Sequence, residues 1–201
     1  LIIRFMPDTA ARAAAFEAGD LDVGGSAPVP LGDLARFEAN PKFQVLRREY
    51  PYTGQQHQIF FNLETPVLKD RRVREAVAHA LDLKRMVDTV YYGAAKVSPS
   101  PVSTALPTWY DPTVQARAFD LARAEKLLEE AGLPKKADGM RVQLRLTINP
   151  FIDLRLADFV RQSLRRAGID AQIQPREFAA YVKTVYADRQ FDLTIESLSN
   201  V

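Results

Sequence analysis

The sequence has no cysteine, only two histidines and a single tryptophan among its 201 residues. The lack of thiols excludes disulfides, cysteine nucleophiles and cysteine-ligated zinc or iron–sulfur centres. Neither His57 nor His79 is followed by His or Glu three or four residues later, so each is interpreted as a packed side chain. No Gly-x-Ser-x-Gly elbow, phosphate-binding loop or dinucleotide fingerprint is present. We therefore expect no catalytic residues, no metal site and no cofactor, and predict that the protein is not an enzyme.

Neither sign of charge dominates, because 27 Lys and Arg stand against 25 Asp and Glu and leave a formal net charge of +2. The basic run from Lys69 to Arg74 is interrupted by Asp70 and followed by Glu75. This pattern is typical of a solvated helix face and not of a surface that binds phosphates. We expect no nucleic-acid partner.

The two ends of the sequence indicate a piece of a longer protein. Leu1–Phe5 has neither the basic segment nor the long apolar run of a signal peptide, and it has the composition of a strand entered midway. The sequence stops at Asn200 and Val201, just past another predicted strand. The lack of a signal peptide therefore does not argue against secretion.

The first 57 residues are predicted to alternate strands and helices. A helix over Thr9–Ala18 should end at Gly19, since glycine tolerates the left-handed conformation of a helix terminus. Leu1–Phe5 and Phe43–Leu46 are predicted strands. The turn residues Pro51–Gly54 mark a boundary between a segment 1–57 and a second region 58–201.

Three helices of the second region are predicted from a capping aspartate. Asp70, Asp82 and Asp120 each stand directly before apolar residues that recur at three- and four-residue spacing. An aspartate in this position accepts hydrogen bonds from the free N–H groups of the first helical turn, and the spacing places the apolar residues on one face.

The last sixty residues give the clearest fold signal. Val142–Ile148, Ile169–Ile173 and Phe191–Ile195 alternate apolar and polar residues, as half-buried strands do. Helical patterns over about Asp153–Ala167 and Glu177–Ala187 separate them. The sequence therefore predicts a mixed α/β fold with a β-α-β-α-β unit and a parallel or mixed sheet.

Ligands of open α/β sheets bind beyond the carboxyl ends of the strands. Asn149, Ser197, Ser199 and Asn200 follow or end these strands and offer amide and hydroxyl groups, so we predict that they bind ligand. A proline- and serine-rich loop over Gly93–Arg117 is too long for an ordinary connection, and loops of this length are usually functional. It supplies three further candidates, Ser98, Ser100 and Trp109, although each of the seven could instead be a cap, turn or packing residue.

Several segments, in this order, resemble a known family. They are Ala18-Gly19-Asp20-Leu21-Asp22, Phe60-Phe61-Asn62, Asp70-Arg71-Arg72-Val73-Arg74-Glu75-Ala76, Ala80-Leu81-Asp82, Gly168-Ile169-Asp170 and Phe191-Asp192-Leu193. Together the segments resemble the peptide/nickel family of extracytoplasmic solute-binding proteins, the receptors that serve ABC importers. No single segment is specific, but their order and spacing are.

The resemblance implies a fold and a function. It implies that residues 58–201 form most of the second lobe of a type II periplasmic binding protein and residues 1–57 part of the first. It further implies that a monomeric receptor captures a small solute between two lobes and delivers it to the transmembrane subunits of an ABC permease outside the cytoplasm. An intramolecular ion pair of Arg74 is also implied.

The class of solute stays open at this stage. Many peptide-binding relatives carry Gly-Trp where this sequence has Ser197-Leu198, followed by an aspartate that pairs with the peptide amino terminus. Val201 stands about where that aspartate would fall, so a peptide with a free amino terminus is in doubt. An oligopeptide, a dipeptide, an opine and a metal chelate remain candidates. The alternatives to a receptor are the sensor domain of a transcription regulator and an enzyme that reuses the scaffold.

Overall fold

The computed structural model describes residues 1–25, 27–46, 56–104 and 106–199. The chain divides into two compact units, Leu1–Arg48 with Tyr91–Ala95 and Glu49–Val90 with Lys96–Val201. We refer to them as unit 1 and unit 2. The predicted boundary after residue 57 falls inside β1 (Gln56–Phe61), which is the first strand of unit 2.

Unit 1 contains helix α1 (Thr9–Ala18), the 3-10 turn η1 (Leu31–Asp33) and the short helix α2 (Leu34–Glu38). The predicted bounds of α1 are confirmed: Asp8 Oδ1 accepts from Ala11 N at the start, and Gly19 ends the helix at φ 81°. Phe16, Phe37 and Phe43 pack around buried Ala13 and Val29. A small aromatic core therefore holds unit 1 together.

The prediction of strands over Leu1–Phe5 and Phe43–Leu46 is wrong. Among residues 1–25 and 27–46 no segment is a β-strand. A strand is stable only when a neighbouring strand takes up its backbone N–H and C=O groups. The described part of unit 1 offers no such neighbour, so an alternating apolar segment stays outside any sheet.

Unit 2 is built on a mixed four-stranded sheet with the order β1-β4-β2-β3. Strands β2 (Val142–Ile148) and β3 (Ile169–Pro175) are parallel, and β4 (Leu193–Leu198) is parallel to β2. β1 runs antiparallel to β4, with Ile59 opposite Ile195. The predicted β-α-β-α-β unit is confirmed, and its strand bounds differ from the prediction mainly in β3 and β4, which run on to Pro175 and Leu198.

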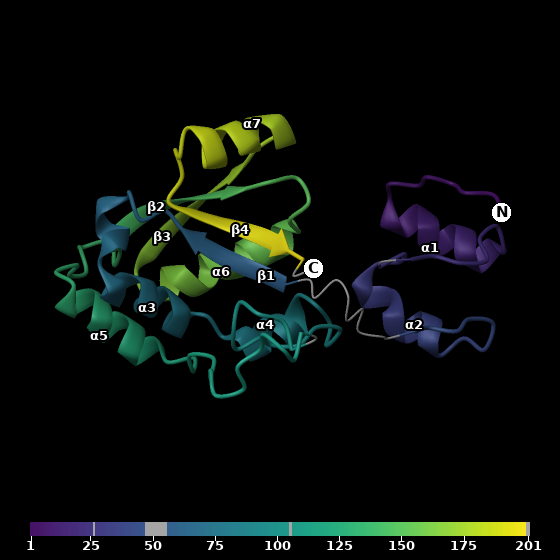
Figure 1. The fold of residues 1–201 in the computed structure, drawn as a ribbon, viewed down its shortest axis with the longest axis horizontal. Helices are drawn as coiled ribbons and strands as arrows, with labels where there is room; N and C mark the ends of the chain where they lie inside the picture. The colour runs from purple at the N-terminus through teal and green to yellow at the C-terminus, as the bar shows by residue number, and fades with distance from the viewer. Residues whose placement is uncertain (26, 47–55, 105, 200–201) are drawn as a thin grey trace. The chain divides into compact units, whose positions relative to one another are not determined.

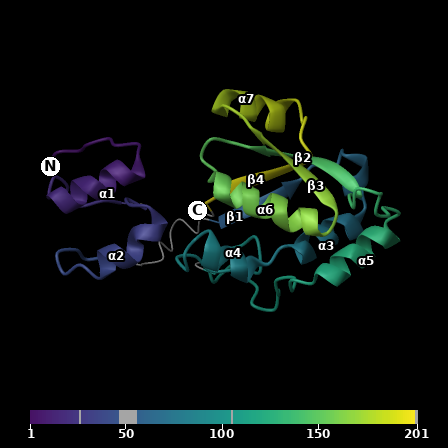
Figure 2. The ribbon, with the colours of Figure 1, turned by 180° about the vertical axis from the view of Figure 1, so that it is seen from behind.

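Helices cover both faces of the sheet (Figures 1 and 2). On one face lie α3 (Arg71–Ala80) and α6 (Leu154–Arg166); α5 (Leu121–Glu130) packs against α3, and α4 (Leu83–Thr89) follows α3. The opposite face carries α7 (Phe178–Val182), which continues into a π-helical turn, η3 (Lys183–Ala187). A 3-10 turn, η2 (Pro66–Lys69), joins β1 to α3.

The predicted aspartate caps are present. Asp70 accepts from Arg72 N over 2.8 Å, Asp82 from Arg85 N over 3.0 Å and Asp120 from Arg123 N over 2.8 Å. Each cap fixes where a helix begins, and the apolar stripe then fixes which face is buried.

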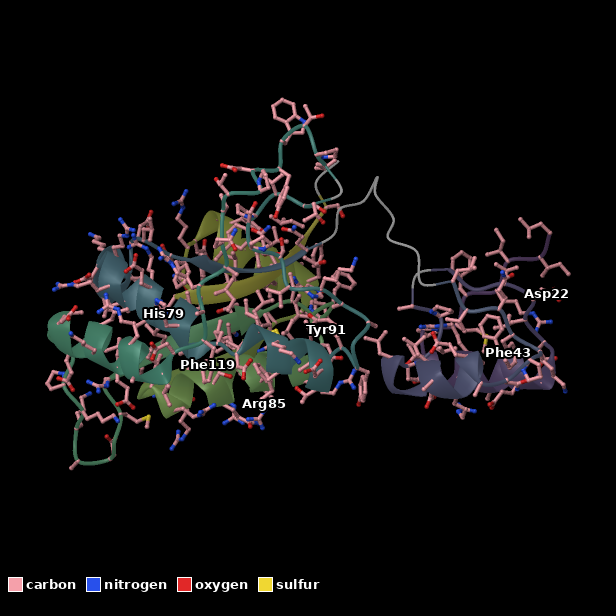
Figure 3. The ribbon with its side chains drawn as sticks, turned by 90° about the horizontal axis from the view of Figure 1, so that it is seen from below. Asp22, Phe43, His79, Arg85, Tyr91 and Phe119 are labelled. Atoms are coloured by element: carbon pink, nitrogen blue, oxygen red, sulfur yellow. The ribbon has the colours of Figure 1, made fainter. Side chains whose placement is uncertain are left out.

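The expected ion pair of Arg74 is not formed among the described residues. Its Nη1 donates instead to the carbonyls of Leu68 and Lys69, at 2.7 and 2.9 Å. The guanidinium therefore satisfies the carbonyl groups of η2, which lie directly before the helix. His79, on α3, lies near Phe119 (Figure 3), and its Nδ1 is 2.8 Å from the carbonyl of Ala118.

Candidate functional site

The carboxyl ends of β2, β3 and β4 meet the start of β1 at one end of the sheet of unit 2. The antiparallel register places His57 opposite Ser197 and Gln56 opposite Leu198. The chain then leaves β2 at Asn149 and β3 at Arg176. We call this end, comprising Gln56, His57, Asn149–Asp153, Arg176–Phe178 and Ser197–Ser199, the carboxyl edge.

Three of the seven predicted site residues end or follow strands at the carboxyl edge. Asn149 is buried, and its Oδ1 accepts from Phe151 N over 2.9 Å, so its amide oxygen shapes the turn after β2. Ser197 is partly buried and Ser199 is exposed. The fourth, Asn200, lies outside the described residues.

The three loop candidates have different surroundings. Ser98 Oγ lies 2.9 Å from the side-chain amide of Gln56 and donates to Ser100 O over 2.8 Å, which ties the loop to the carboxyl edge. Ser100 Oγ accepts from Val102 N over 2.9 Å in a local turn. Trp109 is 76% exposed. Ser98 is thus the loop residue that the structure brings to the edge.

A cavity of about 260 Å³ opens between the sheet and the helices α3, α4 and α6. His57 and Ser98 contribute polar atoms to its lining, and Arg117 contributes a cation. Most of the other lining side chains are apolar, among them Ile59, Val77, Leu81, Met86, Val160 and Ile195. An apolar hollow with few polar groups is the usual form of a small-molecule site.

The polar groups beside this cavity influence one another electrostatically. His57 is exposed as a residue, yet its ring lines the cavity, and burial there lowers the pKa of the imidazole, opposed in part by Asp153. The hydrogen bond from the Arg155 guanidinium lowers the pKa of Asp153, with a smaller contribution from His57. Since Asp153 is also the N-cap of α6, its carboxylate is held in place by the helix as well.

Sequence reasoning missed a group of exposed apolar side chains at the carboxyl edge. Phe151 and Phe178 are 77% and 47% exposed, and their ring centroids lie 5.4 Å apart. Leu154 at the start of α6 and Leu198 at the end of β4 are exposed as well. The available signal was position alone: each of the two phenylalanines stands three residues beyond the strand that it follows. Apolar side chains gathered at one edge mark a binding surface more often than a random distribution does.

A second missed feature is a buried carboxylate on the face that α7 covers. Glu196 is 8% exposed, and its Oε1 accepts from Tyr186 Oη over 2.8 Å and from Tyr181 Oη. Tyr181 Oη also lies 2.7 Å from Thr194 Oγ1. Burial, then the hydrogen bond to Glu196, raises the pKa of Tyr186 to about 12 and raises that of Tyr181 further. Both phenols therefore remain protonated donors at neutral pH.

The described residues contain no cluster of three or more His, Asp or Glu that could hold a metal ion. Within the same part of the chain, no helix has the length and apolar character needed to cross a membrane.

The comparison with known families decides what this chain is. The family described as "Bacterial extracellular solute-binding proteins, family 5 Middle" matches residues 1–201. The chain belongs to this family. As a family 5 protein it has relatives among nickel-, heme- and peptide-binding proteins, and the resemblance predicted from the sequence is confirmed.

Individual relatives are distant in sequence. The nickel-binding periplasmic protein of Escherichia coli is 26% identical over 179 residues, which cover 84% of this chain and 33% of the relative. Heme-binding protein A of Haemophilus influenzae is 28% identical over 186 residues, 91% of this chain and 32% of the relative. The family 5 chain thus spans about a third of these curated relatives.

Solved structures of the family share the fold. NikA from Brucella suis, in complex with Fe(III)-EDTA, superposes with a TM-score of 0.77 at 27% identity, covering 96% of this chain and 40% of that one. DppA from Helicobacter pylori, in complex with the peptide STSA, gives 0.75 at 21% identity over 96% of this chain and 36% of that one. The predicted fold class, a mixed α/β lobe of the type II periplasmic-binding-protein kind, is confirmed.

Proposed function

We propose that the whole protein is the substrate-binding component of an ABC importer outside the cytoplasm, in the periplasm or its equivalent. It captures a peptide or similar small solute and delivers it to the transmembrane subunits of a permease. The observation that carries the proposal is the family match over the entire chain, residues 1–201. Sensor and enzyme roles have no comparable support.

The carboxyl edge of unit 2 is the proposed solute-binding wall. Support comes from the exposed ring pair of Phe151 and Phe178, from the adjoining 260 Å³ cavity and from the hydroxyl groups of Ser98, Ser197 and Ser199. The cavity is small by the standards of whole-ligand sites, so it would accept one apolar group of a solute. The exposed rings would cover the remainder of the solute by stacking and apolar contact.

Lobe closure is the proposed mechanism. Residues 58–201 would supply most of the second lobe and residues 1–57 part of the first, with the remaining two thirds of the protein completing both. Solute contacts made only in the closed form would shift the population towards it, and the permease would recognise that form. No covalent step is required.

Native mass spectrometry of the full-length protein as purified tests the proposal. A retained peptide, opine or metal chelate would support it and identify the solute class. An apo mass, together with no thermal shift across a panel of these three classes, would contradict it. A solute that is chemically changed on incubation would instead favour an enzyme.

The binding wall is tested separately by substitution. F151A and F178A should each weaken binding of the retained solute about tenfold, as loss of a buried aromatic contact does. Leu63→Ala is the matched control, because Leu63 is 53% exposed and lies just past the opposite end of β1. Equal effects of all three variants would show that the solute does not bind at the carboxyl edge.

A further inference from the structure

The buried carboxylate of Glu196 lacks a positive charge to balance it. Among the described residues no Lys, Arg or His forms an ion pair with it, whereas the buried carboxylate of Asp192 is paired with Arg145. Its hydrogen bonds come from two tyrosine hydroxyls, and both reach the same oxygen, Oε1. A carboxylate that is removed from water needs a cation or several donors to stay ionised.

The helix that supplies the two tyrosines is built to reach this carboxylate. Tyr181 and Tyr186 are five residues apart, and in a regular α-helix residues with that separation point about 140° away from each other. The π-helical turn Lys183–Ala187 widens the helix at this point, with Asp188 N donating to Lys183 O over 2.8 Å. Residues five apart then fall on one face. Both hydroxyls can therefore meet at Glu196.

The cluster also contains a buried polar atom without a partner. Thr147 and Thr194 are register partners on β2 and β4, so their side chains share the face that α7 covers. Thr194 Oγ1 lies 2.7 Å from Tyr181 Oη, whereas Thr147 Oγ1 has no hydrogen-bond partner among the described residues and Thr147 is 0% exposed. An unsatisfied buried hydroxyl leaves one polar group of the cluster available to a further hydrogen-bond partner.

The cluster borders the carboxyl edge. Glu196 is two residues before Leu198 on β4, so both side chains lie on the same face, and Leu198 ends the strand at the edge. Glu196 and Tyr181 are 8% and 1% exposed, whereas Tyr186 is 60% exposed, so the cluster meets solvent at Tyr186. A cationic group that entered over Tyr186 could also contact the face of its ring.

We propose that Glu196, with Tyr181 and Tyr186, is a subsite for an ammonium or guanidinium group of the captured solute. The inference rests on the proposed receptor function and narrows it to solutes that carry a cation, such as lysine- or arginine-containing peptides and protonated amines. The cation pairs with the carboxylate while the tyrosines hold Oε1 in place.

The test measures the affinities of four tripeptides, Ala-Lys-Ala and Ala-norleucine-Ala, each with a free and an acetylated amino terminus. They are titrated calorimetrically into the full-length protein and its E196Q variant, and any co-purified solute is tested alongside. Glutamine keeps an acceptor for both tyrosines, so the fold is retained. Cation-bearing peptides should bind about 10- to 100-fold more weakly to E196Q, as loss of a charged hydrogen bond predicts. The acetylated norleucine peptide should change by less than about twofold.

Matched controls show whether a cation that pairs with Glu196 comes from the solute or from the protein itself. Glu64→Gln removes an exposed carboxylate at the opposite end of β1 and should leave all affinities unchanged. If E196Q lowers the melting temperature of the solute-free protein and leaves peptide selectivity intact, the cation comes from the protein's own chain and the subsite is overturned. Equal binding of charged and neutral peptides by both proteins also overturns it but preserves the receptor. If no peptide binds and no solute co-purifies, the receptor function fails, and the subsite with it.

Discussion

Arg145 forms a bidentate ion pair with Asp192: Nη2 lies 2.9 Å from Oδ1, and Nε lies 3.0 Å from Oδ2. The backbone N–H of Arg145 donates to the same carboxylate over 2.7 Å, and Thr65 Oγ1 donates over 2.8 Å. The contact joins the middle of β2 to the entry of β4 and to the turn after β1. The Phe-Asp-Leu segment noted in the sequence thus has a structural role at the opposite end of the sheet from the carboxyl edge.

Asp192→Asn should destabilise the full-length protein by about 1–3 kcal/mol at neutral pH, because a buried group loses charge-assisted hydrogen bonds. Burial alone would raise the pKa of Asp192, but the bonds from Arg145 and Thr65 outweigh it and the pKa is lowered. The stabilisation is therefore complete above the ordinary aspartate pKa and is lost as pH falls through the lowered value.

Urea denaturation at several pH values measures this effect. The difference in unfolding free energy between wild type and D192N should disappear as the solution becomes acidic. Asp158→Asn is the control, since Asp158 forms an exposed ion pair with Arg161 that contributes little. A gap of constant size from neutral to acidic pH would contradict the assigned role.

Asn62 holds the chain that leads into β4. Its Nδ2 donates to the carbonyls of Arg189 and Phe191, at 2.9 and 2.8 Å, and Arg189 is held at φ 53°. Asn62→Ala leaves a buried carbonyl without its donor and should cost about 2 kcal/mol of unfolding free energy. Asn40→Ala, which removes one exposed bond to Lys42 N, should cost no more than about 0.5 kcal/mol. Equal losses in urea denaturation would show that the Asn62 amide is dispensable.

Two glycines of unit 2 distinguish the stability cost of a strained backbone from the cost of steric crowding by a new side chain. Gly168 and Gly132 have φ of 89° and 79°, so alanine is strained at both. A Cβ at Gly168 would lie 2.9 Å from Arg141 Cγ, whereas one at Gly132 meets no atom within 4 Å. G132A should therefore cost about 1 kcal/mol, and G168A clearly more because Arg141 must move. Thermal denaturation of both variants checks the order, and a larger loss in G132A would be inconsistent with it.

Local signals explain why much of unit 2 could be predicted. Asp70, Asp82 and Asp120 act within one helical turn, and the alternation over Val142–Ile148 reports the two faces of a single strand. Neither signal depends on distant parts of the chain. The β-α-β-α-β connection in a parallel or mixed sheet then followed from general rules of α/β folds. The strand order β1-β4-β2-β3 was not predicted, and ligand binding at the carboxyl edge stays a prediction.

The features that were missed depend on distant partners. Whether Leu1–Phe5 becomes a strand is decided by a neighbouring strand, and the sequence of the segment itself carries no such information. The alternation predicted over Phe191–Ile195 ended before Glu196, and the two tyrosines that meet this carboxylate depend on a π-helical turn that no periodicity indicates. Asn149 was predicted to bind ligand from its position after a strand; its amide oxygen accepts from Phe151 N, and ligand binding by Asn149 stays a prediction.

Tyr186 offers a test of the Glu196 cluster at alkaline pH. Burial and the bond to Glu196 raise its pKa from 10.0 to about 12. The phenol of the unfolded chain ionises first, so the contribution of Tyr186 to stability is complete below pH 10 and is lost as pH rises through the folded pKa, about 12. Tyr186→Phe removes this loss, so its stability should fall less steeply than that of wild type across the same interval.

Urea denaturation of both proteins between these two pH values measures the slopes. An ultraviolet absorbance titration of wild type and Y186F shows whether one late-ionising tyrosine is lost in the variant. Tyr110→Phe removes a tyrosine from the proline- and serine-rich loop and should leave the wild-type slope unchanged. If Y186F and wild type lost stability in parallel, Tyr186 would not be a donor to Glu196 in solution. The carboxylate would then depend on Tyr181 alone, and a solute cation would have to supply still more of the balancing interaction.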